Sequence, residues 1–230
     1  MSKRAALAET VSGGAIKVLI VDDHPVVREG LRAMLKSPGI SVVGEARGGG
    51  EAVERTRELN PDVVLMDVKM PDMDGIAATQ AIKAQQRATS VIMITSFETK
   101  DYLRRAIEAG AAGYLVKGSS REALIQAVKV VREGGSLVDA SLLSQLFGGH
   151  GSGEWVEGDT RDVALASLSP RELQSLKLLS RGLTNKEIAQ EMHYSVGTVK
   201  NVVQRIIEKL GVSDRTQAAV YAVRGGLDVD

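Results

Sequence analysis

The chain has 230 residues, which is the length of two domains of ordinary size. Hydrophobic residues make up 43% and charged residues 25%, so the composition is that of a globular protein with packed cores. There is no cysteine, which excludes disulfides, thiolate metal sites and a cysteine nucleophile. The formal net charge is zero, which argues against a uniformly basic coat for nucleic acid but leaves room for one basic face.

No apolar run approaches the roughly 20 residues that are needed to span a bilayer. Residues 1–15 are small and polar and lack the apolar stretch of a secretion signal, so we expect a flexible leader there. Together these features predict a cytoplasmic protein without a membrane partner.

Residues 16–135 alternate short apolar strands with amphipathic helices. Such alternation predicts a flavodoxin-like, doubly wound α/β domain, in which a five-stranded parallel sheet is covered by helices on both faces. The expected strands are 16–21, 41–46, 63–66, 91–94 and 114–116. The expected helices are 25–36, 50–59, 75–84 and 101–109, and a last one that runs to about residue 133 after a capping box of Ser119 and Glu122.

Residues 136–166 are assigned to a linker, because glycine and polar residues dominate from about residue 148. The single tryptophan, Trp155, lies in it, and its ordinary interpretation is a side chain that docks on a domain surface. Residues 167–230 are then helical throughout, which predicts a small all-α domain of four helices. The expected N-caps of these helices are Ser169, Thr184, Ser195 and either Ser213 or Asp214.

Polar residues follow four of the five predicted strands: Asp22 and Asp23, Asp67, Thr95, and Lys117. Because the carboxyl ends of parallel strands meet at one edge, the three carboxylates would converge and repel unless a hard cation such as Mg²⁺ balances them. Any one of these residues alone is ordinarily a turn or solvent-facing residue, but their joint placement favours a site. Asp67 would be the nucleophile toward a phosphoryl group, and the metal and Lys117 would neutralise the phosphoryl oxygens.

At this point the first half resembles the receiver domain of two-component response regulators. The matching strings are Val-Asp-Asp-His-Pro from Val21, Leu-Met-Asp-Val-Lys-Met-Pro-Asp-Met-Asp-Gly from Leu65, Ile-Thr-Ser from Ile94, and Gly-Tyr-Leu-Val-Lys from Gly113.

This resemblance implies that Asp67 accepts a phosphoryl group from the phosphohistidine of a sensor histidine kinase. It implies that Mg²⁺ is held by Asp22, Asp23, Asp67 and the backbone carbonyl of Lys69. It further implies that Thr95 and Tyr114 form a switch, which repacks the surface around the fourth helix, the fifth strand and the fifth helix. For Tyr114, a packed core aromatic is an equally open interpretation.

From Val199 the apolar residues recur at helical spacing, which predicts one buried helix face. They are Val199, Val202, Val203, Ile206, Ile207 and Leu210. The opposite face carries Lys200, Asn201, Gln204, Arg205 and Glu208. A polar outer face is ordinarily just solvated, but these side-chain types also hydrogen-bond base edges and phosphates, and a helix fits the major groove. With a capped helix over 185–192 and a turn over 194–197, the pattern is a helix-turn-helix.

This second half resembles the LuxR/NarL-type helix-turn-helix from Leu168 to about Leu227. The strings are Leu-Ser-Pro-Arg-Glu, Gly-Leu-Thr-Asn-Lys-Glu-Ile-Ala, Ser-Val-Gly-Thr-Val-Lys-Asn and Lys-Leu-Gly-Val-Ser-Asp-Arg-Thr-Gln-Ala. With the receiver, this identifies the chain as a member of the NarL/FixJ class. Val202 departs from the pattern, because many relatives carry His there. The resemblance implies base contacts from Lys200, Asn201 and Gln204, and phosphate contacts from Thr184, Asn185, Ser195, Thr198 and Arg205.

The last helix, about 216–223, is expected to expose small residues such as Ala218, Ala219 and Ala222. These small residues fit either close helix contact across a two-fold axis or simple packing within the bundle, and the sequence does not separate the two.

The leading hypothesis is a transcription factor controlled by phosphorylation, which binds double-stranded DNA and forms a homodimer when phosphorylated. Before phosphorylation the receiver would mask the DNA-binding face or prevent dimerisation. We do not expect an enzyme beyond the receiver's own phosphorylation and dephosphorylation. One alternative is a phosphorylation-independent DNA-binding protein whose receiver is only a dimerisation module. The other is an aspartyl-phosphate phosphatase, which would need a substrate cleft and would have no use for a recognition helix.

Overall fold

The computed structural model describes residues 14–96, 99–135, 137–138, 140–147 and 164–227. The predicted leader up to residue 13, the glycine-rich segment and Trp155 lie outside them. The first half contains β1 (Ile16–Val21), α1 (Pro25–Met34), β2 (Ile40–Ala46), α2 (Gly49–Leu59), β3 (Val63–Asp67), α3 (Gly75–Gln85), β4 (Ser90–Thr95), α4 (Lys100–Glu108), β5 (Gly113–Val116) and α5 (Arg121–Arg132). They are followed by α6 (Ala140–Phe147), α8 (Pro170–Ser180), α9 (Asn185–Glu191), α10 (Val196–Leu210) and α11 (Arg215–Arg224).

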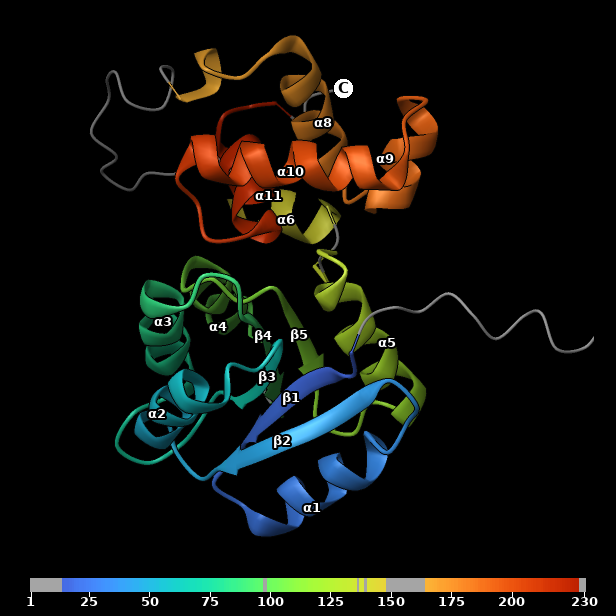
Figure 1. The fold of residues 1–230 in the computed structure, drawn as a ribbon. Helices are drawn as coiled ribbons and strands as arrows, with labels where there is room; N and C mark the ends of the chain where they lie inside the picture. Colours follow the sequence, from blue (N-terminus) through green and yellow to red (C-terminus); the bar gives the residue numbers. More distant parts are fainter. Residues whose placement is uncertain (1–13, 97–98, 136, 139, 148–163, 228–230) are drawn as a thin grey trace, which may run out of the picture.

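The sheet confirms the predicted flavodoxin-like topology. Its strand order is β2-β1-β3-β4-β5, and every neighbouring pair is parallel. Helices α1 and α5 cover one face, while α2, α3 and α4 cover the other (Figure 1). The apolar residues of β1, β3 and β4 point alternately into the two resulting cores, which explains why these strands read as unbroken hydrophobic runs.

The start of α5 differs from the prediction by one residue. Ser120 is the N-cap, and its hydroxyl accepts a hydrogen bond from the amide of Ala123 at 3.2 Å. The predicted capping box of Ser119 and Glu122 is therefore wrong. Ser119 instead donates its hydroxyl to the carbonyl of Val116 at 2.8 Å. Gly118, with φ of +100°, turns the chain after β5 and delays the helix start.

In the second half, the four helices α8, α9, α10 and α11 pack around one core, as the predicted caps indicate. Ser169 and Thr184 each form a complete capping box at the starts of α8 and α9. Ser195 caps α10, and Asp214, rather than Ser213, caps α11. The buried stripe of α10 faces α8, α9 and α11 as its spacing predicts.

Helix α6 lies inside the segment that was assigned to a linker. Leu143 and Phe147 are 1% and 8% exposed, and they pack into the same core as α8–α11. The linker was assigned from the glycines that follow α6, so the short apolar stripe of α6 itself was not recognised as a helix. The expected exposure of Ala218, Ala219 and Ala222 is wrong. They are buried in that core, at 0–2% exposure, so within the described chain they serve packing of the bundle.

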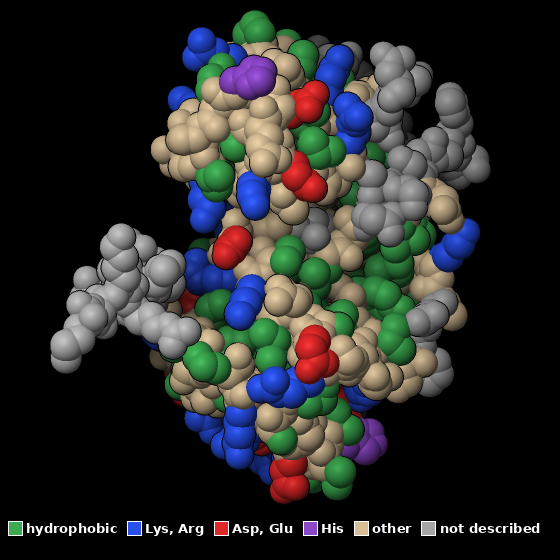
Figure 2. Space-filling view, turned by 90° about the vertical axis from the view of Figure 1, so that its right-hand side faces the viewer, with side chains coloured by type: hydrophobic (Ala, Val, Ile, Leu, Met, Phe, Trp, Pro, Cys, Tyr) green, Lys and Arg blue, Asp and Glu red, His purple; other side chains and the backbone are tan. Residues whose placement is uncertain are grey.

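The two lobes touch where α11 of the helical lobe meets α4 of the first lobe. Ile107 of α4 belongs to the core of the helical lobe, and α11 contacts α4 directly. Figure 2 shows side chains of both charges interspersed where the two lobes meet. Among the described residues, no helix combines the length and apolar character required to cross a membrane.

Candidate functional site

Three carboxylates meet at the carboxyl edge of the sheet. Asp22 directly follows β1, and Asp67 ends the neighbouring strand β3, so the topology places them side by side. Both are nearly buried, at 1% and 6% exposure, while Asp23 is partly exposed. The turn after β3 is tight. A Cβ atom at Gly75 would lie 1.9 Å from the carbonyl oxygen of Asp67, so only glycine allows α3 to begin there.

Lys117 connects the two buried carboxylates. Its Nζ lies 2.7 Å from Asp22 Oδ2 and 2.9 Å from Asp67 Oδ2. The other oxygen of Asp67 accepts a hydrogen bond from the amide of Val68 at 2.8 Å. The carboxylate of Asp67 is therefore held in one orientation by residues on both sides.

The protonation behaviour follows from this crowding. Burial raises the pKa of Asp67, and the charge of Asp22 adds to that effect, although the bonds from Lys117 and Val68 act in the opposite direction. Burial by itself would lower the pKa of Lys117, but its bonds to Asp22 and Asp67 outweigh burial, so the pKa of Lys117 is raised. Lys117 thus stays charged at neutral pH, and more positive charge at the site would favour ionised Asp67.

The donor set fits a hard divalent cation. One ligand atom each from Asp22, Asp23, His24 and Asp67 can be chosen so that all lie within 4.8 Å of one another. Asp22 Oδ2 and Asp23 Oδ1 are buried and accept no hydrogen bond of good geometry within the described chain. Each has only the close nitrogen of an ion pair, from Lys117 and His24, at 2.7 Å. Buried carboxylate oxygens with spare lone pairs are what such a cation requires.

The remaining predicted residues of this edge are also nearby in the fold. Thr95 ends β4 and is 2% exposed, and Tyr114 lies on the adjacent strand β5, half-buried against the core beneath α3 and α4. Lys69 follows Asp67 in the loop, and its Nζ lies 5.8 Å from the ring centroid of Tyr102 on α4.

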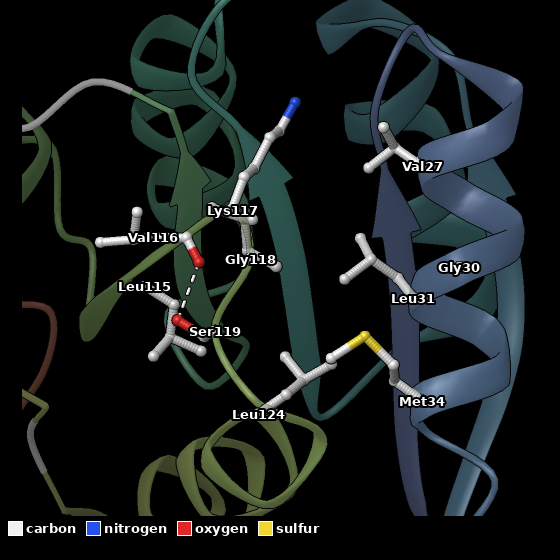
Figure 3. Close-up of a pocket in the computed structure, with 11 residues that line it drawn as sticks. Val27, Gly30, Leu31, Met34, Leu115, Val116, Lys117, Gly118, Ser119 and Leu124 are labelled. Carbon is white, nitrogen blue, oxygen red and sulfur yellow. Dashed lines mark hydrogen bonds between the residues drawn. The ribbon is translucent and has the colours of Figure 1, made fainter.

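A separate apolar pocket of about 240 Å³ adjoins the site between α1 and the turn that leads into α5. In Figure 3, Leu31 and Met34 of α1 point across it toward Leu124, while Lys117 points away from it. The Nζ of Lys117 contacts Asp22 and Asp67 instead. This pocket carries no charged group other than Lys117, and it was not anticipated from the sequence.

The polar face of α10 is exposed as predicted, for Lys200, Asn201, Gln204 and Arg205. Only part of it faces bulk solvent. Lys200 and Gln204 line a cleft of about 520 Å³ whose opposite wall belongs to the first lobe, including Lys83 and Arg132. Gln204 also donates to Glu208 at 2.9 Å. Asn201 and Arg205 do not line this cleft.

The residues predicted to contact phosphates divide into two groups. Thr184, Ser195 and Thr198 are exposed at helix starts, where the first two serve as N-caps. Asn185, by contrast, is 8% exposed, and its Nδ2 donates to the backbone carbonyl of Glu133 in the first lobe at 3.3 Å. This predicted contact therefore already has a partner inside the molecule.

The residues that join the two lobes were not predicted from the sequence. Lys83 of α3 is 5% exposed and forms an ion pair with Asp214 at 3.2 Å. Arg215 is 5% exposed and donates to the carbonyl of Gly134 at 3.2 Å. A lysine on a helix and an arginine after a cap have no local signal that distinguishes them from solvated residues, because their partners are distant in the chain.

The chain matches two protein families. The profile described as "Response regulator receiver domain" matches residues 18–129, and the one described as "Bacterial regulatory proteins, luxR family" matches residues 166–222.

Similar proteins cover nearly the whole chain. It is 43% identical over 217 residues to the transcriptional regulatory protein LiaR of Bacillus subtilis (strain 168), a match that spans 92% of this chain and 99% of that protein. It is 40% identical over 218 residues to the transcriptional regulatory protein LnrK of the same organism, spanning 93% and 99%. The solved receiver domain of the response regulator NarL from Mycobacterium tuberculosis is 36% identical, with a TM-score of 0.52, over 53% of this chain and 99% of that one. The chain therefore belongs to the two-component response regulators of the NarL/FixJ class, in which a receiver domain is joined to a LuxR-type helix-turn-helix.

Proposed function

We propose that Asp67 is the phosphoacceptor of this regulator and that a sensor histidine kinase is its phosphoryl donor. The observation that carries the proposal is the convergence of Asp22, Asp67 and Lys117 within ion-pair distance at one edge of the sheet. The carboxylate of Asp67 attacks the phosphorus, the bond from phosphorus to the donor breaks, and an acyl phosphate forms. The ammonium of Lys117 then neutralises a phosphoryl oxygen.

Mg²⁺ is the proposed cofactor. Asp22, Asp23, Asp67 and the backbone carbonyl of Lys69 would hold it, and when bound it supplies positive charge to the phosphoryl oxygens. Such positive charge beside Asp67 would offset the effect of burial, which raises the pKa of Asp67. The buried position of Asp67 keeps bulk water from the acyl phosphate.

The proposed signal passes from Thr95 and Tyr114 to the boundary between the lobes. Both residues lie on strands next to α4, and α4 contacts α11. Backbone carbonyls on either side of the α4–β5 turn also accept hydrogen bonds from side chains of α11. Gln217 Nε2 donates to the carbonyl of Ile107, and Thr216 Oγ1 donates to the carbonyl of Ala112 at 3.3 Å. A movement of Thr95 and Tyr114 that repacks α4 and β5 would weaken these bonds.

Loss of those bonds would let the lobes separate and would expose the whole polar face of α10 to DNA. Lys200, Asn201 and Gln204 are the proposed base contacts, each worth about 1–3 kcal/mol of discrimination where the contact is bidentate. Thr184, Asn185, Ser195, Thr198 and Arg205 are the proposed phosphate contacts. In the arrangement of this structure, which we call closed, Lys200 and Gln204 face the receiver across the cleft of about 520 Å³, a volume far smaller than that of a duplex segment.

The freed molecule would act as a homodimer on double-stranded promoter DNA, because one helix-turn-helix reads one half-site. Its place of action would be the cytoplasm, where bacterial DNA lies. The domain limits that we propose are 16–135 for the receiver and 167–230 for the DNA-binding domain, with α6 of the intervening segment packed on the latter.

The test is labelling with radioactive acetyl phosphate and Mg²⁺. Asp67→Asn should abolish labelling. Asp62→Asn is the matched control, because Asp62 lies at the opposite end of the same strand and pairs with Arg132. Equal labelling of the Asp67 variant and wild type would refute the assignment. DNA binding that ignores phosphorylation would favour the dimerisation-module alternative, and catalytic turnover of p-nitrophenyl phosphate would favour the phosphatase.

A further inference from the structure

We propose that Arg215 is a further DNA-contacting residue, which binds a backbone phosphate together with Asn185. In the closed molecule, two backbone carbonyls of the receiver occupy the place of that phosphate. The inference rests on the proposed DNA binding and extends it to Arg215, for which the sequence predicted no role.

The two side chains form a rigid fork. Arg215 Nη1 donates to Asn185 Oδ1 at 2.7 Å, and Nη2 donates to the carbonyl of Leu183. Both acceptors belong to the DNA-binding domain, so the fork survives separation of the lobes. Asn185 is the first residue of α9, directly after Thr184, and Arg215 is the first residue of α11. The fork therefore lies where α9 begins, beside the proposed phosphate contact of Thr184.

Two donors of the fork point at the receiver. Arg215 Nη1 also donates to the carbonyl of Gly134 at 3.2 Å, and Asn185 Nδ2 donates to the carbonyl of Glu133 at 3.3 Å. These two oxygens come from consecutive residues at the end of α5, where Glu133 is the C-cap and Gly134 has φ of +79°. A helix C-terminus carries partial negative charge, so the receiver presents a pair of oxygens that resembles one edge of a phosphate.

Separation of the lobes removes both oxygens at once. Arg215 Nη1 and Asn185 Nδ2 then lose an acceptor each, which leaves both donors available to another oxygen. A DNA phosphate can replace both carbonyls, and its charged oxygens form stronger hydrogen bonds than neutral carbonyls. Burial lowers the pKa of Arg215 to about 10, so the guanidinium remains charged at neutral pH. The closed receiver and DNA thus compete for the same two donors.

A purely structural role, in which Arg215 only ties α9 to α11, predicts a different result. A phosphate contact from a cation releases counterions, so its loss lowers the slope of log K against log salt by about 0.9, whereas loss of a structural tie lowers affinity without a change in slope.

The experiment uses the full chain, phosphorylated with acetyl phosphate, and a DNA fragment selected from random sequences by the wild type. Arg215→Gln should reduce the salt slope by about 0.9 per half-site. Arg224→Gln is the matched control, because it removes the same charge from the same helix and also breaks a contact between the lobes, with Glu108 at 2.8 Å. Its salt slope should equal that of the wild type. An unchanged slope for Arg215→Gln would overturn the inference.

A second variant covers the case in which Arg215→Gln does not fold. Asn185→Asp keeps an oxygen for Arg215 but places a negative charge against the phosphate, so binding of the phosphorylated protein should fall at least tenfold. The DNA is then made with one phosphate at a time replaced by an uncharged methylphosphonate. At one position this replacement should weaken binding of the wild type but leave binding of the Asn185→Asp variant unchanged. If the variant shows the same affinity and the same sensitivity profile as wild type, the inference is wrong. Failure of wild-type labelling or of all wild-type DNA binding would instead refute the proposed function.

Discussion

Replacing Asp214 by Asn should increase DNA binding by the unphosphorylated protein. Asp214 forms an ion pair across the lobe boundary with Lys83 at 3.2 Å, and the two side chains are 15% and 5% exposed. Asp214 Oδ1 also caps α11 by accepting from the amide of Gln217 at 3.0 Å. Asparagine is as good an N-cap as aspartate, so the substitution removes the charge and leaves the cap in place.

The magnitude follows from the burial of the pair. Lys83 retains bonds to the carbonyls of Arg87 and Thr89, at 3.2 Å and 3.0 Å, so it loses only one of its partners. A hydrogen bond to a charged group contributes about 1.5–3 kcal/mol. Because Lys83 and Asp214 meet only in the closed arrangement, the equilibrium between closed and open forms should shift by that amount. At 1.4 kcal/mol per factor of ten, this is about 10-fold to 100-fold.

The assay is fluorescence anisotropy of labelled DNA titrated with unphosphorylated protein at fixed salt. Glu191→Gln is the control, since Glu191 is exposed in the same domain and its loss changes the net charge equally. The double variant Lys83→Met with Asp214→Asn should gain less DNA affinity than the two single variants added together. Each substitution removes the same ion pair, so their effects are not additive. If Asp214→Asn and Glu191→Gln bind DNA equally well, the ion pair does not hold the molecule closed.

Three further outcomes are expected. Leu143→Ala should lower the free energy of unfolding by about 2–5 kcal/mol in urea titrations, because Leu143 of α6 is 1% exposed; a loss below about 0.5 kcal/mol would show that α6 is not part of the core. Gly75→Ala should reduce phosphoryl labelling strongly, because its Cβ would clash with the carbonyl of Asp67, and labelling at the wild-type rate would contradict that geometry. Glu172 is bonded by Lys209 Nζ at 2.7 Å, which together with the Ser169 bonds lowers its pKa from 4.5 to about 2. Its contribution to stability is therefore full above about pH 4.5 and is lost as the pH falls toward 2, and Glu172→Gln should flatten the stability profile in that window, as thermal melts can measure.

Much of the proposed phosphoryl site could be predicted because its residues occupy the same local position on neighbouring strands. Asp22, Asp67 and Thr95 each lie at the carboxyl end of an apolar run, and parallel topology brings such ends together. Strand and helix periods, and the capping boxes of α8 and α9, are likewise short-range patterns. The strand order, the four-helix bundle and the exposed face of α10 were therefore accessible from the chain itself.

Tertiary structure decided which residues meet across long separations. Nothing local marks Lys83 as the partner of Asp214, or Asn185 and Arg215 as donors to the end of α5, since each pair depends on how the lobes pack. The same packing buries α6, which composition assigned to a linker, and turns Lys200 and Gln204 of α10 toward the receiver. Local periodicity specifies elements and their faces, but contact between faces is a property of the folded whole, because burial and charge pairing exist only after distant segments have come together.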